Sequence, residues 1–268
     1  MNLRYVLALF TVCWFSAASA QRPVMLTETA SPLGIRHLQT GIGVEYLEKH
    51  QAPARDLAEK EIRVFMASMN FGVAENVDFN LEWRGGLVAT FPSGHKGYDW
   101  GDLTVATKIT IVENPESFPN IGIRSAVKLP NTSYLPHKLG SDQTDFFFQA
   151  LLSGYSGGFE GRLNLGFGIV GVPASTGIQN DVFTLNVAGV FPIGSGTSMF
   201  LEANGVKGYF GGDGKLVTRA GITTPWEGVE WSLFGSLRVL GDNRDFGGAF
   251  EMSENWSIGV YLKKDVWW

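Results

Sequence analysis

The chain has 268 residues, a net charge of −5 and 34 glycines, and 13% of its residues are aromatic. Its acidic balance argues against nucleic acid as a partner. Cys13 is the one cysteine, so no disulfide can form within the chain. No run of about 20 apolar residues follows residue 20, which argues against helical membrane spans.

The first twenty residues have the features of an export signal. Arg4 supplies a charged start, Tyr5–Phe15 is apolar, and Ala18-Ser19-Ala20 fits a cleavage site. We therefore predict that residues 1–20 are a cleaved signal peptide and that residues 21–268 form one domain.

A strict alternation of apolar and polar residues begins at Val77. Val77, Phe79 and Leu81 would lie on one face of an extended strand, and Asp78 and Glu82 on the other. The same period of two recurs in segments of about ten residues, the length that crosses a bilayer at a tilt. The twelve segments are about Arg36–Glu48, Ile62–Val73, Val77–Ala89, Asp102–Val112, Ile121–Leu129, Asp145–Ser153, Phe159–Gly171, Val182–Phe191, Met199–Val206, Leu216–Thr224, Val229–Val239 and Ser257–Trp268.

The links between these segments alternate in length. Tight turns are predicted at Ala74–Asn76, Gly154–Gly158, Pro192–Thr197 and Pro225–Gly228. Longer links are predicted at Lys49–Glu61, Thr90–Gly101, Pro130–Thr144, Val172–Asp181 and Leu240–Trp256. Short turns on one side and long loops on the other are typical of outer-membrane barrels. The sequence thus predicts an all-β fold: a single antiparallel transmembrane β-barrel of about 12 strands, with short periplasmic turns and longer extracellular loops. A secreted β-sandwich is the alternative.

The polar faces of the segments must point inward, because a charge facing lipid at the midplane costs about 2–4 kcal/mol. Inward aromatic residues such as Phe200, Phe234 and Tyr261 favour a lumen that is narrow or partly apolar. The charges could set the selectivity of a pore or pair across a plugged lumen. We place Arg124, Lys128 and Asp145 at a constriction. The candidates that line the lumen are Asp78, Glu82, Arg84, Lys108, Arg124, Lys128, Asp145, Glu160, Arg162, Glu202, Arg219, Glu230 and Arg238.

The chain ends in an alternating apolar and aromatic pattern. Leu262, Val266 and Trp268 share one face of the last segment, and Lys264 interrupts that face. This tail resembles the insertion signal with which outer-membrane barrels finish. We predict that it is read by the barrel-assembly machinery.

A family resemblance rests on short motifs in the middle of the chain. Residues 125–130 read Ser-Ala-Val-Lys-Leu-Pro, and residues 139–145 read Leu-Gly-Ser-Asp-Gln-Thr-Asp. Together with Asn164–Phe167 and Phe200–Glu202, they resemble the outer-membrane family named for the meta pathway of phenol degradation. The resemblance covers about residues 120–240 and implies an outer-membrane barrel that passes small, often hydrophobic molecules.

The sequence therefore predicts a protein of the bacterial outer membrane that acts as a passive channel for small, hydrophobic or aromatic molecules. Its expected partners are outer-membrane lipid, lipopolysaccharide, the assembly machinery and a small permeant. No catalytic residue, cofactor or metal is predicted. The alternatives are a structural barrel that transports nothing and a rim hydrolase. The hydrolase would use His95 near Asp99 and Asp102, or His137 near Asp142 and Asp145.

Two loop sequences are interpreted as ordinary loops. Asp242–Asp245 could offer oxygen ligands to calcium, but it lacks the glycine and terminal glutamate of an EF-hand loop. Gly211–Gly214 fits a β-turn better than a loop that binds phosphate.

Overall fold

The computed structural model describes residues 25–48, 58–113, 119–133, 139–171, 179–208, 214–241 and 255–267. Within these ranges the regular structure is entirely β, and every strand pairing is antiparallel. No helix in the described ranges is long and apolar enough to span a membrane. The strands are β1 (His37–Glu48), β2 (Lys60–Ala74), β3 (Val77–Trp83), β4 (Gly86–Thr90), β5 (Lys96–Trp100), β6 (Leu103–Val112), β7 (Asn120–Leu129), β8 (Asp145–Ser156), β9 (Phe159–Gly171), β10 (Gln179–Gly194), β11 (Thr197–Gly208), β12 (Gly214–Trp226), β13 (Val229–Gly241) and β14 (Trp256–Trp267).

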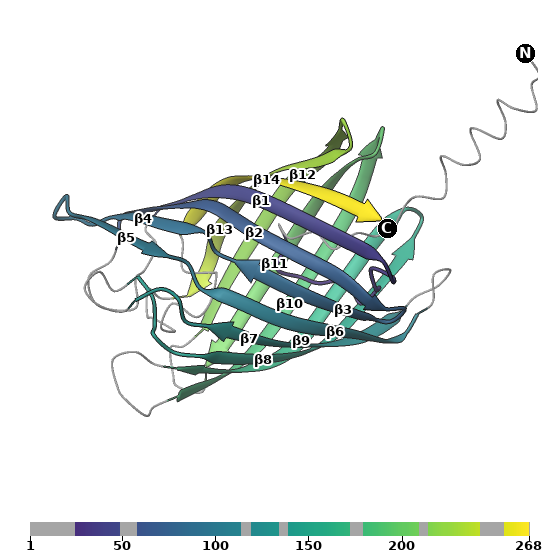
Figure 1. Cartoon of the computed structure of the whole chain (residues 1–268), viewed down its shortest axis with the longest axis horizontal. Coiled ribbons are helices and arrows are strands. Elements are labelled where there is room, and N and C mark those ends of the chain that lie inside the picture. The colour runs from purple at the N-terminus through teal and green to yellow at the C-terminus, as the bar shows by residue number, and fades with distance from the viewer. Residues whose placement is uncertain are drawn as a thin grey trace, which may run out of the picture.

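The sheet closes into a twelve-stranded barrel (Figure 1). Strand β1 pairs with β14 on one side and with β2 on the other, so Gly41 lies opposite both Lys263 and Ser68. Closure pairs the backbone groups of every barrel strand and leaves no open edge around the wall. The predicted antiparallel barrel is confirmed.

The third predicted strand was wrong in one respect. Instead of one strand over Val77–Ala89, β3 ends at Trp83 and β4 begins at Gly86. A bulge causes the break: Phe65 of β2 has a φ of 58°, and Gly85 opposite it has a φ of 82°. A Cβ at residue 85 would lie 2.1 Å from the carbonyl oxygen of Val64, so glycine is required there.

Beyond the bulge, β4 continues along the same edge of β2 and pairs with β5, a strand that the sequence did not predict. The residues assigned to a loop at Thr90–Gly101 therefore include half of a hairpin. This β4–β5 hairpin extends past the other strands at one end of the barrel (Figure 1).

The two ends of the barrel differ as predicted. At the turn end lie the start of β1, the end of β14 and the short links after β2, β6, β8, β10 and β12. The loop end carries the longer links and the β4–β5 hairpin. Three turns have positive φ at both central residues, which is the geometry of type I′ hairpins: Gly157-Gly158, Ser195-Gly196 and Glu227-Gly228. Strands β10 and β12 also extend through Pro192 and Pro225, which had been assigned to turns.

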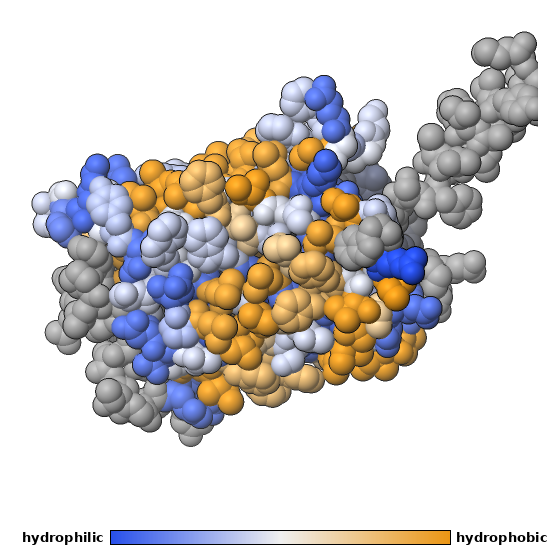
Figure 2. Space-filling view, in the orientation of Figure 1, coloured by the Kyte–Doolittle hydropathy of each residue, from blue (hydrophilic) through white to orange (hydrophobic). Residues whose placement is uncertain are grey.

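The two faces of the wall have opposite chemistry. Outward side chains are apolar and exposed, including Phe167, Phe183 and Leu233, at 50%, 52% and 56% exposure. On the face that Figure 2 shows, hydrophobic residues gather over the middle of the barrel wall and hydrophilic residues lie toward its ends. The inward face is mostly polar and buried. This is the arrangement that lipid outside and a polar lumen inside require.

Candidate functional site

Most of the charged residues predicted to face the lumen are buried within the barrel. Eight of them are at most 5% exposed: Asp78, Lys108, Lys128, Asp145, Glu160, Arg162, Glu202 and Arg219. Five others are partly exposed: Glu82, Arg84, Arg124, Glu230 and Arg238. Their contribution to selectivity stays a prediction.

The lumen also contains residues 25–34, here called the N-terminal segment, which precede β1. The sequence did not predict this, because the segment has no alternating pattern and its partners are distant along the chain. It crosses the lumen from the wall of β2, β3 and β6 to the wall of β9–β14. Its buried side chains are at most 7% exposed: Met25, Thr27, Thr29, Ala30 and Leu33.

An ion pair of β3 and β6 holds one end of the N-terminal segment. Asp78 and Lys108 lie 3.0 Å apart and are both fully buried. The backbone N–H of Leu33 donates to both carboxylate oxygens of Asp78, at 3.0 and 3.1 Å. Lys108 donates to the carbonyl oxygens of Thr29 and Ser31. Two buried charges therefore use the backbone of the segment to satisfy their hydrogen bonds.

Small side chains allow the segment to lie against the wall. A Cβ at Gly72 of β2 would lie 1.7 Å from the carbonyl oxygen of Gly34. The Thr110 hydroxyl donates to the carbonyl of Ala30 at 2.7 Å, and the Ala30 N–H donates to the Ser153 hydroxyl at 3.0 Å. The fit of backbone to wall leaves no room for a larger residue at position 72.

In the middle of the segment, Glu28 pairs with a cation of the wall. It lies 3.1 Å from Arg124, which is also 3.6 Å from Glu82. The hypothesis of a constriction made by Arg124, Lys128 and Asp145 therefore changes. The structure joins Lys128 to Asp145 at 2.6 Å, but it joins Arg124 to the N-terminal segment.

Glu202 of β11 receives the far half of the segment. Its carboxylate accepts hydrogen bonds from the N–H and hydroxyl of Thr27, at 3.0 and 2.8 Å, and from the N–H of Leu26 at 3.1 Å. Arg162 donates to the carbonyl of Thr27 at 3.2 Å and pairs with Glu160 at 2.7 Å. The lumen thus binds the segment through its backbone as well as its side chains.

The first described residues pack against apolar groups on the inner wall. Met25 lies in a cluster with Phe200, Phe234 and Tyr261, and these three aromatic residues are at most 4% exposed. Leu26 packs against inward valines of β9–β12. The prediction that inward aromatic residues make the lumen partly apolar is confirmed.

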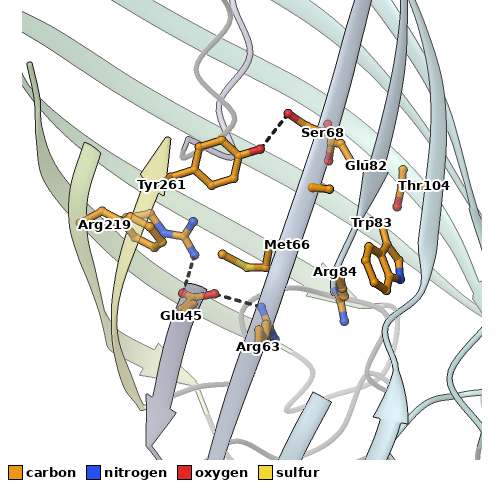
Figure 3. Close-up of a pocket in the computed structure, with 12 residues that line it drawn as sticks. Glu45, Arg63, Met66, Ser68, Glu82, Trp83, Arg84, Thr104, Arg219 and Tyr261 are labelled. Carbon is orange, nitrogen blue, oxygen red and sulfur yellow. Dashed lines mark hydrogen bonds and ion pairs between the residues drawn. The ribbon is translucent and has the colours of Figure 1, made fainter. Parts of the chain in front are cut away.

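A cavity of about 600 Å³, a volume that includes open solvent, remains beside the segment (Figure 3). Glu45 lines the cavity and pairs with two arginines, Arg63 at 3.2 Å and Arg219 at 3.6 Å. The Ser257 hydroxyl also donates to Glu45, at 2.7 Å. Arg84 lines the same cavity. Three arginines and two glutamates, Glu45 and Glu82, thus border this space, and Glu61 also pairs with Arg63 at 2.9 Å.

The other side of this cavity is aromatic and apolar. Phe234, Tyr261 and Met66 line it, and Tyr261 donates to the Ser68 hydroxyl at 2.8 Å (Figure 3). Phe234 and Tyr261 also belong to the cluster around Met25. The end of the N-terminal segment is therefore separated from the cavity by one layer of side chains.

Lys128 forms a second charged group at the loop end. It lies 2.6 Å from Asp145 and 3.4 Å from Asp102, and it donates to the Ser141 hydroxyl at 2.9 Å. Asp145 also accepts from the N–H of Gly171 at 2.9 Å. These contacts connect the ends of three strands and their loops.

Asp102, which lies between β5 and β6, has a lowered pKa. Burial raises the pKa, but the positive charges of Lys128 and Arg84 outweigh it, together with hydrogen bonds from the N–H groups of Asn131 and Thr132. The ionised carboxylate is thus the form that holds the loop.

The hydrolase alternative finds little geometric support. Asp99 and Asp102, predicted beside His95, accept hydrogen bonds from loop backbone, such as that from the Ser133 N–H to Asp99 at 2.8 Å. His95 stacks on Phe91. Across the ranges that the structure covers, no group of His, Cys, Asp and Glu residues could hold a metal ion.

The C-terminal strand places its predicted signal on the outer face. Val266 is 39% exposed and Leu262 partly exposed, and both face away from the lumen. His37 of β1 lies 2.8 Å from Asp265 and stacks on Trp267, which joins the first strand to the last. Recognition of this strand by the assembly machinery stays a prediction.

Several predictions concern residues that lie outside the described ranges. They are the signal peptide 1–20, His137, Gly211–Asp213, Asp242–Asp245 and Trp268.

The fold is similar to that of solved outer-membrane proteins. An outer-membrane channel from Pseudomonas putida F1 has a TM-score of 0.62 and 12% identity, covering 88% of this chain and 98% of that one. The NanC porin has a TM-score of 0.55 and 8% identity, covering 86% and 99%. No family model and no curated protein sequence matches the chain. The likeness shows an outer-membrane barrel fold, and the family resemblance stays a prediction.

Proposed function

We propose that the protein is a channel of the bacterial outer membrane that passes small molecules, and that its own N-terminal segment narrows it. The observation that carries the proposal is the cavity bordered by Glu45, Arg63 and Arg219, which remains open beside the N-terminal segment. The loop end would face outside and the turn end the periplasm, because short turns lie on the periplasmic side of such barrels.

The lining of the cavity supports a permeant that is partly apolar. Phe234, Tyr261 and Met66 offer apolar surface, while the arginines and the glutamates Glu45 and Glu82 offer charges of both signs. We propose small hydrophobic or aromatic molecules as permeants, in keeping with the resemblance to the family named for the meta pathway of phenol degradation. Membership of that family is part of this proposal.

The N-terminal segment is proposed to act as the gate of this route. It is held by hydrogen bonds and ion pairs rather than by strand pairing, so it can leave the lumen without breaking the barrel wall. The cluster around Met25 separates its end from the cavity. Withdrawal of the segment would therefore widen the route at this point.

Conductance in planar bilayers tests the proposal. Refolded protein beginning at residue 21 should give small channels, and protein beginning at residue 35 should give clearly larger ones. Liposome swelling with sugars, amino acids and aromatic acids would then define the permeant. If neither form conducts or passes any solute, the channel proposal fails and a structural barrel replaces it.

A further inference from the structure

The β4–β5 hairpin has an outer face that the channel does not use. Its register arranges that face in three rows across β2, β4 and β5. Because side chains alternate with a period of two, residues of these rows point the same way. From the barrel toward the tip, the rows are Val64, Gly86 and Trp100; then Ile62, Val88 and Tyr98; then Lys60, Thr90 and Lys96.

The two rows nearer the barrel form an exposed apolar and aromatic surface. Tyr98 and Trp100 are 61% and 62% exposed, and Phe65 at the bulge is 66% exposed. Trp100 stacks on Trp83 of β3, with ring centroids 5.8 Å apart, so the aromatic surface continues from the barrel wall. The opposite face of the hairpin is covered, since Leu87 packs in a buried cluster.

The third row is basic. Lys60 and Lys96 lie opposite the same residue, Thr90, and both are exposed. Two of the three nearby acids are engaged: Glu61 is buried and pairs with Arg63 at 2.9 Å, and Asp99 binds loop backbone. Glu59 is exposed beside Lys60 in the chain. Two cations thus stand one row beyond the aromatic surface, on the side away from the lipid belt.

We propose that this face binds lipopolysaccharide of the outer leaflet, with the aromatic rows against its acyl chains and sugars and the two lysines on its phosphates. The proposal rests on the proposed outer-membrane location. The order of the rows matches the order of chemical groups in the glycolipid, because its phosphates lie just above the boundary between acyl chains and water. Aromatic rings favour that boundary, and lysines near an anionic leaflet are attracted to it. Figure 2 shows the hydrophilic tip of the hairpin beyond the hydrophobic surface of the barrel.

Titration of the purified full chain in detergent with fluorescent lipopolysaccharide tests this proposal. The Lys60→Gln/Lys96→Gln variant should bind about 25-fold more weakly, since each lysine near an anionic lipid surface contributes about fivefold. Lys264→Gln is the matched control, because Lys264 is exposed on β14 near the turn end. Its affinity should be unchanged. A Tyr98→Ala/Trp100→Ala variant should also bind more weakly, through loss of apolar contact.

Two further ligands identify the chemistry that is bound. Lipopolysaccharide treated with phosphatase should bind wild type and the lysine variant equally. Vesicles of phosphatidylglycerol carry one phosphate per lipid rather than the clustered phosphates of lipopolysaccharide, so the lysine variant should lose less affinity for them. An equal loss with phosphatidylglycerol would overturn the assignment in favour of a general anionic surface, and unchanged affinity in the lysine variant would overturn it altogether. Conductance of the same variants should equal that of wild type, so a failure here is distinct from a failure of the channel proposal.

Discussion

Two charged regions of the lumen use their charges differently. Around Asp78 and Lys108 both groups are fully buried, and the backbone of the N-terminal segment satisfies their remaining hydrogen bonds. Around Glu45 the carboxylate is shared between Arg63 and Arg219, and open space remains beside them. The hydrogen bonds of the first region are satisfied only when the N-terminal segment is present, whereas the ion pairs of the second region are formed by residues of the wall alone.

The difference shows which charges maintain the barrel and which can act on a permeant. A buried pair that loses one partner leaves an uncompensated charge, so its energetic effect is structural. A charge beside a cavity changes the field that a solute meets, so its effect is on selectivity. Inward position alone does not separate these roles.

The largest expected effect is the loss of the buried pair. Lys108→Met should destabilise the folded barrel by about 3–5 kcal/mol, because Asp78 is left charged and buried. Denaturant unfolding of the protein in detergent, followed by tryptophan fluorescence, measures this. Adding Asp78→Asn should restore part of the loss. Lys207→Met, at an exposed position, is the control and should change stability by less than about 0.5 kcal/mol.

A substitution at Gly72 should displace the segment from the wall. Gly72→Ala places a Cβ against the carbonyl of Gly34, so we expect a loss of about 1–3 kcal/mol and a larger single-channel conductance. Gly205→Ala is the matched control, because the nearest atom to a Cβ there is 3.4 Å away. Equal conductance of wild type and Gly72→Ala would argue against narrowing by the segment.

Changes at the cavity should act on selectivity more than on stability. Arg219→Gln leaves Glu45 paired with Arg63, and Glu202, which is 4.0 Å from Arg219, keeps its hydrogen bonds from Leu26 and Thr27. The change should shift permeability toward cations by roughly twofold to tenfold. Reversal potentials in a salt gradient measure the shift. Arg238→Gln removes the same charge from a residue that does not line the cavity. An equal shift in that variant would mean that net charge, rather than the cavity, sets selectivity.

The smallest effect concerns pH at the loop end. The pKa of Asp102 is lowered from its ordinary value of 3.8, so its carboxylate stabilises the folded rim above that pH. This contribution is lost as the pH falls below about 3.8 toward the folded pKa. The hydrogen-exchange protection factors of Asn131 and Thr132, which are corrected for the intrinsic pH dependence of exchange, should therefore fall as the pH is lowered from 5 to 3. In Asp102→Asn the protection factors should be lower and nearly independent of pH over that window.

The wall of the barrel could be predicted because the alternation of apolar and polar residues can be recognised within each strand alone. Alternation at Val77, Phe79 and Leu81 assigns an outer face whichever strands are neighbours. The break after Trp83 was missed because Gly85 and Gly86 have no side chain to mark a face. The outward positions change there from odd numbers in β3 to even numbers in β4, which the bulge at Phe65 of the partner strand explains.

The contents of the lumen could not be predicted because they depend on distant contacts. Glu202 binds Thr27, which lies 175 residues away in the chain, and no local sequence pattern at either residue predicts this contact. The sequence indicated that the inward charges could pair across a plugged lumen, but not that the plug was the chain itself. An inward glycine such as Gly72 was a weak signal of close backbone approach.

Disulfide trapping tests the central claim, that the N-terminal segment occupies the lumen, most directly. The chain from residue 21 onward has no cysteine, so Thr27→Cys/Asn204→Cys introduces a single pair, at positions where the side-chain oxygens lie 3.3 Å apart. Oxidation of the refolded barrel should cross-link this pair as completely as Ser236→Cys/Ser257→Cys, whose hydroxyls lie 2.7 Å apart on paired wall strands. Cross-linking of the wall pair without cross-linking of the Thr27 pair would contradict the account.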